Sequence, residues 1–221
     1  MKISPAPFLF LVVSAATQCA CGEAPNPAAD DECRAEYAPF ACRVLSFKAG
    51  QGAGFGQDKM PEIVLGPPNP QGESISTDVL SLGMGGEIII ELANAIIDGE
   101  GPDFIIFENP FIINGSTSVF KELALVSVSE DGELFHEFAC DPTASQNSHC
   151  AGAAPVFANT TEQIPADNPM VSGGDLFDLS DIAQSRARFI KIVDLKSVFG
   201  ADGKAGFDLD AVIGLHSEEQ P

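Results

Sequence analysis

The 221-residue chain contains no tryptophan and one tyrosine, and it has 11 lysine and arginine residues against 32 aspartate and glutamate residues. The formal charge of −21 argues against nucleic-acid binding, which depends on clustered lysine and arginine. It argues equally against electrostatic adhesion to anionic lipid. The shortage of Trp and Tyr disfavours a sugar-stacking platform, since exposed aromatic rings serve that purpose. An acidic excess of this size suits solubility through self-repulsion or the binding of divalent cations.

The motifs of several enzyme classes are also missing. The sequence has no Gly-x-Ser-x-Gly elbow, no His-Glu-x-x-His pair and no Walker loop. The glycines of Gly50–Gly56 alternate instead of following the dinucleotide pattern, and no long helical segment follows them. We therefore expect a protein that is not an enzyme. A hydrolase remains an alternative, because a glycosidase needs only two carboxylates across a cleft.

The first twenty residues have the layout of a secretory signal peptide. Lys2 supplies a positive charge, Phe8–Val13 is an apolar core, and Ser14–Ala20 is small or polar. The apolar core is shorter than the roughly 20 residues that cross a bilayer, and no later segment is longer. We therefore expect residues 1–20 to be a signal peptide and the rest of the chain to be exported without a transmembrane anchor.

The end of this leader resembles the lipobox of bacterial lipoproteins, in which a cysteine after a small residue is lipid-modified and becomes the mature N-terminus. Ala20 precedes Cys21, and Gln18 stands where the lipobox prefers leucine. The resemblance implies lipidation of Cys21 and an outer-membrane-anchored or cell-surface location. Plain signal cleavage near Ala20, followed by secretion, is the alternative.

The remainder of the chain divides by composition. Residues 21–38 are rich in Ala, Pro, Asn and acidic side chains, which predicts a flexible acidic tether. Residues 39–217 are long enough for one domain with a full core, and residues 218–221 form a tail. Of the six cysteines, the four beyond Cys21 form two close pairs in sequence. Their spacing predicts the disulfides Cys33–Cys42 and Cys140–Cys150, which suit an oxidising compartment, and it disfavours a zinc site.

Short apolar runs separated by Gly, Pro, Asn and Asp fill the domain. Val126–Ser129 alternates apolar and polar residues, as a half-buried strand does, and Asp131-Gly132 predicts a hairpin turn. Only Asp178–Arg188 has the composition of a short helix, with Asp178 or Ser180 as its cap. This pattern predicts an all-β jelly-roll sandwich with at most one short helix. The expected strands are Arg43–Lys48, Glu62–Leu65, Val79–Leu82, Glu87–Leu92, Phe104–Phe107, Leu123–Ser129, Leu134–Phe138, Pro155–Ala158, Phe189–Leu195 and Ala211–Leu215.

Five segments resemble, in order and spacing, one family of uncharacterised bacterial cell-surface proteins and lipoproteins. They are Val79–Ile88, Gly101–Phe111, Glu122–Gly132, Gly173–Asp181 and Gly206–Val212. The resemblance spans roughly residues 47–215 and implies a galactose-binding-like (discoidin-like) jelly roll. The last segment is similar to the final strand of many carbohydrate-binding jelly rolls, in which calcium often ties the first loop to that strand. This similarity implies that Asp208 or Asp210 faces the loop at residues 50–58.

Acidic residues gather at the predicted strand ends and beside glycine-rich loops. Asp208 and Asp210 flank Leu209, so a regular strand would place both carboxylates on one face. Calcium takes six to eight oxygen ligands from carboxylates, amides and backbone carbonyls, a mixture that such positions offer. Each acid also has a structural alternative as a helix cap, a turn residue or a partner of loop amides. The expected calcium ligands are Asp208, Asp210, Glu108, Asn109, Asp175 and Asp178.

These features predict a non-catalytic cell-surface binding or adhesion module stabilised by calcium, with a glycan or a surface protein as its partner. A carbohydrate-binding lectin-like domain is one alternative, and a hydrolase with paired carboxylates is the other. An exposed cluster of Phe55, Phe111 and Phe199 would favour the lectin. Two carboxylates about 5–10 Å apart across a cleft would favour the hydrolase.

Overall fold

The computed structural model describes residues 1, 33, 35–68, 78–108, 111–112, 119–120, 122–144, 148–159, 162–196 and 206–218. The predicted signal peptide after Met1, the predicted lipidation site Cys21 and the predicted ligand Asn109 lie outside the described residues. Among the described residues, no helix has the length and apolar character that crossing a membrane requires.

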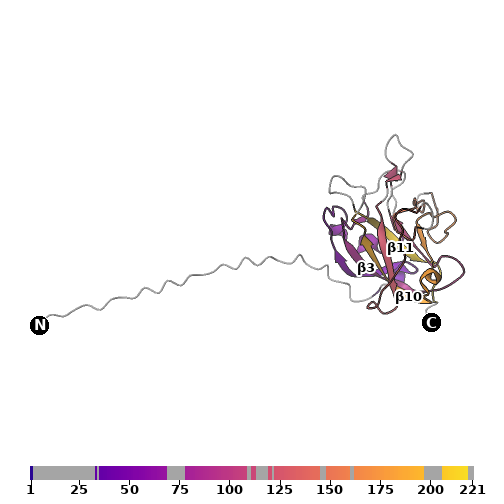
Figure 1. Cartoon of the computed structure of the whole chain (residues 1–221), viewed down its shortest axis with the longest axis horizontal. Helices are drawn as coiled ribbons and strands as arrows, with labels where there is room; N and C mark the ends of the chain where they lie inside the picture. Colours follow the sequence, from indigo (N-terminus) through magenta and orange to yellow (C-terminus); the bar gives the residue numbers. More distant parts are fainter. Residues whose placement is uncertain are drawn as a thin grey trace.

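Two antiparallel sheets pack as a β-sandwich, which confirms the predicted all-β fold (Figure 1). The five-stranded sheet has the order β1-β3-β10-β7-β8 and the four-stranded sheet the order β2-β11-β4-β9. The five-stranded sheet consists of β1 (Ala41–Lys48), β3 (Glu87–Ile97), β10 (Arg186–Asp194), β7 (Ala124–Ser129) and β8 (His136–Glu137). The four-stranded sheet consists of β2 (Leu80–Ser81), β11 (Asp208–Gly214), β4 (Phe104–Glu108) and β9 (Asp175–Phe177). A separate ribbon pairs β5 (Phe111–Ile112) with β6 (Val119–Phe120) and stands beyond one end of the sandwich (Figure 1).

The core lies between the two sheets because alternate strand residues point inward. Ile88, Ile90 and Leu92 of β3 are fully buried and belong to the same cluster as residues of β4 and β11. Three buried phenylalanine rings pack at centroid distances of 5.0–5.9 Å, in stacked and edge-on contacts. Burying one such side chain contributes about 1.5–3 kcal/mol. The three rings are those of Phe104, Phe138 and Phe177.

β11 departs from the regular alternation that the sequence predicted. Its register against β4 shifts between Leu209 and Ala211. Leu209 therefore belongs to the main core, whereas Ala211 packs in a second cluster on the other face of the sheet. A bulge at Asp210 thus interrupts the period of two, and the regular strand on which the sequence would place Asp208 and Asp210 on one face is not present.

Three other expectations fail locally. The predicted helix over residues 178–188 is a single 3-10 turn, η4 (Leu179–Ile182), that ends where Ala183 takes the left-handed conformation. The predicted strand at residues 62–65 is the 3-10 turn η3 (Glu62–Val64). Residues 155–158 contribute only an isolated bridge between Val156 and Gly173. Two further 3-10 turns are η1 (Ala35–Tyr37) and η2 (Gln57–Lys59).

Both predicted disulfides are present, with S–S distances of 1.98 Å for Cys33–Cys42 and 2.08 Å for Cys140–Cys150. The first disulfide joins Cys33 to Cys42 of β1, so the folded structure begins before the predicted domain start at residue 39. Tyr37 packs against the main core, and its carbonyl accepts a 2.7 Å hydrogen bond from the amide of Phe40. The last residues of the predicted tether are thus part of the folded domain.

Candidate functional site

Each end of β4 carries a buried carboxylate. Asp103 immediately precedes the strand and is 0% exposed, and Glu108 is its last residue and is 2% exposed. β11 runs antiparallel to β4, so its first residue, Asp208, lies toward Glu108, and His216 lies beyond its other end, toward Asp103. We call these two regions the Glu108 end and the Asp103 end of the sandwich. Both ends contain a buried acidic side chain, but the electrostatic settings of the two side chains are opposite.

At the Asp103 end, both carboxylate oxygens of Asp103 have hydrogen-bond partners. Oδ1 accepts the Gly99 amide at 2.8 Å and lies 2.9 Å from His216 Nδ1. Oδ2 accepts the Leu179 amide at 2.7 Å. The side chain therefore ties η4 and the segments after β3 and β11 to the start of β4. This is the structural use of a buried acid, whose desolvation is offset by fixed donors.

Asp98, Asp103 and Asp178 each place one oxygen within 4.8 Å of the others. Asp98 is exposed, and Asp178 caps η4 by accepting the Ser180 amide at 2.9 Å. The cap confirms one of the two residues that the sequence predicted for that role. Both oxygens of Asp103 already accept hydrogen bonds, so a cation at this triad would compete with those donors for Asp103.

At the Glu108 end the carboxylates are less well satisfied. Glu108 Oε2 and Asp208 Oδ1 are buried and have no hydrogen-bond partner among the residues that the structure describes. A hydrogen bond from Ser81 reaches the Asp208 side chain, and Ser81 is the cross-strand partner of that residue. A buried carboxylate oxygen without a donor is unfavourable by several kcal/mol unless a proton or a cation supplies the missing charge.

The pKa values at this end follow from that setting. Burial raises the pKa of Glu108 well above its usual range, and the negative charge of Asp208 raises it further. Burial, with the same charge, raises the pKa of Glu122 to about 7, against the lowering effect of its bond from Gly206. Burial raises the pKa of Asp208 to about 6. All three carboxyl groups therefore keep their protons to a higher pH than free carboxyl groups do.

Two further acids border this cluster and hold the strand ends together. Asp194 accepts backbone amides from Gly85 (2.7 Å), Lys196 (2.7 Å) and Phe207 (3.0 Å). The Glu122 Oε1 atom accepts the Gly206 amide at 2.5 Å. These bonds bring the start of β11 against the glycine-rich segment before β3, where a Cβ at Gly206 would lie 2.5 Å from a Gly83 atom. Only glycine allows this approach.

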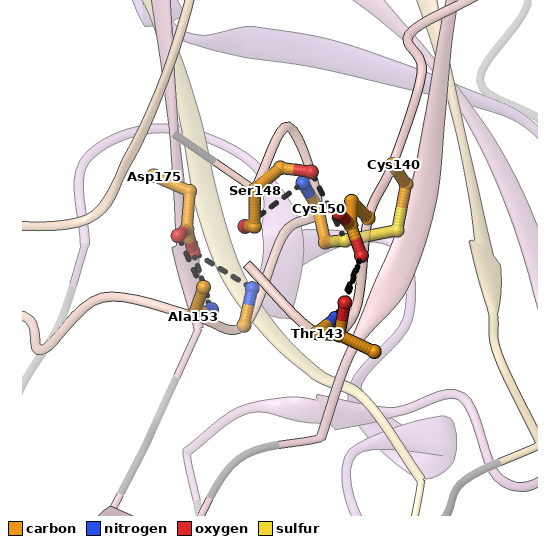
Figure 2. The surroundings of a disulfide bond; sticks show 8 residues. Cys140, Thr143, Ser148, Cys150, Ala153 and Asp175 are labelled. Atoms are coloured by element: carbon orange, nitrogen blue, oxygen red, sulfur yellow. Dashed lines mark hydrogen bonds between the residues drawn. A yellow bond between two sulfur atoms is a disulfide. The ribbon is translucent and has the colours of Figure 1, made fainter. Parts of the chain in front are cut away.

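Asp175 lies in a cradle of amides beside the second disulfide (Figure 2). Its carboxylate accepts the amides of Gly152 (2.7 Å), Ala153 (3.2 Å) and Ala154 (3.0 Å). These three residues follow Cys150 after one intervening residue, Ala151, so the disulfide lies next to the cradle in the chain. The charge of Asp175 is close enough to contribute to the raised pKa of Glu108.

The structure divides the predicted calcium ligands between the two ends. It brings Glu108 and Asp208 together, with Asp175 close by, and places Asp178 at the Asp103 end. Asp210 is buried at the bulge of β11. The five predicted ligands that the structure describes therefore do not form one site. Sequence reasoning missed Glu122 and Asp194, although both stand at strand ends, which is the signal that identified Glu108.

The predicted contact between Asp208 and the loop at residues 50–58 is indirect. β2 lies between them, since Ser81 pairs with Asp208 and donates its amide to Phe55 at 3.1 Å. The Gln57 side chain also donates to the Ser81 carbonyl at 2.8 Å. The loop therefore supports the strand that neighbours Asp208.

The donor set of the Glu108 end consists of carboxylate oxygens, with a serine hydroxyl at its border. Such hard oxygen ligands suit calcium or magnesium, whereas zinc and copper favour imidazole and thiolate ligands. The chain matches no known protein-family model, and no curated protein sequence is significantly similar to it.

Proposed function

We propose that the chain is an exported, non-catalytic binding domain whose Glu108 end holds a divalent cation, with calcium as the best-fitting ion. One observation carries the proposal: two buried carboxylate oxygens, Glu108 Oε2 and Asp208 Oδ1, have no hydrogen-bond partner among the described residues. A bound cation would supply what these oxygens lack. The Asp103 end supports this by contrast, since a buried acid there has a donor for each oxygen.

We favour calcium over bound protons as the source of the missing positive charge, because the proposed location of the domain is outside the cytoplasm. The disulfides Cys33–Cys42 and Cys140–Cys150 indicate an oxidising, extracytoplasmic environment. Free calcium in such environments reaches the range of weak extracellular sites, with dissociation constants of about 10⁻⁴–10⁻³ M. In that range the ion competes with protons for the cluster at neutral pH.

The location proposed for the domain is the bacterial surface, through a lipid on Cys21, with secretion as the alternative. Cys21→Ser should move the protein from the membrane fraction to the soluble exported fraction. Cys19→Ser is the matched control, because it changes a neighbouring cysteine that the lipobox pattern does not select. Unaltered fractionation of the Cys21→Ser variant would mean that lipidation at Cys21 is wrong.

The partner proposed for the domain is a glycan or a surface protein. The lectin-like alternative has limited support, because Phe55 is 50% exposed, whereas the side chains of Phe111 and Phe199 lie outside those that the structure describes. The hydrolase alternative draws on the raised pKa values of Glu122 and Asp208, since a protonated acid beside a carboxylate is the pair that such enzymes use.

The proposal is tested by calorimetric titration of calcium into the metal-free domain at pH 8. Wild type is expected to bind one calcium ion, and Asp208→Asn to lose that binding. Asp98→Asn is the matched control, because it neutralises an exposed acid at the opposite end. Absence of binding in the wild type would refute the cation site, and loss of binding only in Asp98→Asn would move it to the Asp103 end.

A further inference from the structure

The two disulfides of the domain have different surroundings. Cys33–Cys42 lies beside the five-stranded sheet, where Cys42 Sγ is 3.3 Å from the carbonyl oxygen of Glu91. Cys140–Cys150 leads instead into residues 150–154, which run along the Glu108 end of the sandwich. We call residues 150–154 the wall segment. The second disulfide, unlike the first, is thus continuous with a segment that borders the proposed cation site.

The wall segment packs tightly against the starts of β7 and β11. Ala151 and Ala124 are both 0% exposed, and each donates its amide to the other's carbonyl oxygen at 3.0 Å. Gly152 has a φ of +82° and approaches the Glu122 carbonyl oxygen so closely that a Cβ atom would overlap it. That Cβ atom would also lie 3.3 Å from the ring of Phe207. The segment therefore contacts one acid of the cluster and the residue immediately before β11.

The wall segment is also bound to β9. The amides of its last three residues donate to the Asp175 carboxylate at 2.7–3.2 Å. Asp175 pairs with Ile106 of β4, and Glu108 lies two residues further along the same face of that strand. The wall segment thus joins β7 of one sheet to β9 and the start of β11 in the other. The positions of the acids at this end depend on these connections.

The disulfide fixes the start of the wall segment to the core. Phe138 is buried in the cluster of three phenylalanine rings and donates its amide to the Val126 carbonyl oxygen at 3.0 Å. Cys140 follows shortly after and donates its own amide to the Phe138 carbonyl oxygen at 2.8 Å. Cys140 is half-buried between exposed residues, whereas Cys150 is 2% exposed. The more accessible cysteine is thus held by the core, and the buried one holds the wall segment.

We propose that Cys140–Cys150 is a redox control on the Glu108 end. The intact disulfide holds the wall segment against the acids, and its reduction loosens that segment and weakens cation binding. The inference rests on the proposed cation site and names its regulation. A site whose ligands are already in place binds more tightly, because less ordering accompanies binding. The site is then complete only in an oxidising compartment, which the chain reaches after export.

The reductant in this control is a dithiol. One of its thiolates forms a bond to Cys140 Sγ, the Cys140–Cys150 bond breaks, and the Cys150 sulfur leaves and takes up a proton. The second thiol of the reagent then displaces Cys140, so the dithiol becomes a cyclic disulfide and both cysteines become thiols. A disulfide reagent reverses the exchange and is itself reduced to thiols.

Calorimetric titration of calcium into the purified protein at pH 8 tests the inference. Cys140→Ala/Cys150→Ala should bind calcium about tenfold more weakly than wild type, since Ala151 and Asp175 still hold part of the wall segment. Cys33→Ala/Cys42→Ala is the matched control, because it removes the other disulfide, and it should keep the wild-type affinity. Reducing this control variant with dithiothreitol should lower its affinity to that of Cys140→Ala/Cys150→Ala, and oxidised glutathione should restore it.

Amide hydrogen exchange in chelator gives a second readout that needs no cation. The amides of Gly152, Gly206 and Phe207 donate to acids at the Glu108 end. They should exchange about tenfold faster in Cys140→Ala/Cys150→Ala than in wild type, because the wall segment opens locally. The control variant should keep the wild-type exchange rates at these three positions.

The two readouts separate this inference from the cation site on which it rests. Wild-type affinity in Cys140→Ala/Cys150→Ala, or equal losses of affinity in the two double variants, overturns the redox control and leaves the cation site in place. Absence of calcium binding in every form refutes the cation site, and hydrogen exchange then decides. A selective increase in exchange supports control of the wall segment, and unchanged exchange overturns it. Circular dichroism checks the fold of each variant, and reduction of folded protein tests the disulfide without refolding.

Discussion

The two ends of β4 show how differently one fold treats a buried carboxylate. Asp103 and Glu108 are 0% and 2% exposed, and only the first four residues of β4 separate them. Asp103 receives two backbone amides and faces His216. Glu108 keeps an oxygen without a donor among the described residues and has acids as its charged neighbours. The comparison distinguishes a buried acid that stabilises the fold from one that destabilises it unless a proton or a cation is bound.

The difference follows from what the neighbouring loops supply. Turns such as the one that begins at Gly99 present amides toward the start of β4, and a carboxylate there replaces water as their acceptor. At the other end, the available amides go to Asp194 and Glu122. Glu108 Oε2 and Asp208 Oδ1 are buried and accept no hydrogen bond from the residues that the structure describes. Desolvation without donors is the condition that makes a buried acid a cation ligand or a proton carrier.

The largest effect is expected from Asp103→Asn. The amide group of asparagine would set a donor against the N–H of Gly99 or Leu179, leaving a buried donor unsatisfied. We expect a loss of about 3 kcal/mol in the free energy of unfolding, measured by urea denaturation, with and without calcium. A loss that calcium restores would contradict the structural role of Asp103.

A smaller effect is expected from pH on the metal-free domain. The pKa values of Glu122 and Asp208 are raised to about 7 and about 6, so the native state holds more protons than the unfolded state between about pH 4 and pH 7. Stability is therefore greatest at the acidic side of this window and falls as pH rises through it, by on the order of 2 kcal/mol. Urea titrations at several pH values measure the slope, and a rising stability over the same range would reverse the assigned sign.

The smallest effect, and the one with the opposite sign, is expected from Glu108→Gln. The substitution removes a carboxyl group whose ionisation is opposed by burial and by neighbouring acids, so the metal-free domain should gain about 1 kcal/mol at pH 8. The same variant should lose the response to calcium. Thermal and urea unfolding in chelator measure the gain, with Glu100→Gln as a control on an exposed acid. A marked loss of stability in chelator would mean that Glu108 has a donor after all.

The sequence predicts the sandwich well because alternation in strands such as Val126–Ser129 is a local signal. It fails where tertiary contacts decide. The bulge at Asp210 has no local mark, and the short edge strand β9 follows Gly173-Gly174 with only three residues. The helix expected over residues 178–188 gives way to β10, because Ala187 is drawn into the core of the five-stranded sheet.

The candidate site is predictable only in part, for the same reason. Strand-end acids are visible in the sequence, and this signal identifies Glu108 and Asp208. Which strand ends meet depends on sheet order, so Asp178 was grouped with them although it lies at the opposite end. Whether an acid is satisfied depends on amides far away in the chain, such as that of Leu179, 76 residues from Asp103.

The thermal midpoint of the purified domain, measured with excess calcium and with chelator at pH 5 and at pH 8, tests the central claim most directly. Calcium at about 100 times its dissociation constant should stabilise the native state by about 2.7 kcal/mol. We expect a clear rise of the midpoint at pH 8 and a much smaller one at pH 5, where protons occupy the Glu108 end. An identical midpoint with calcium and with chelator at pH 8 would contradict the account.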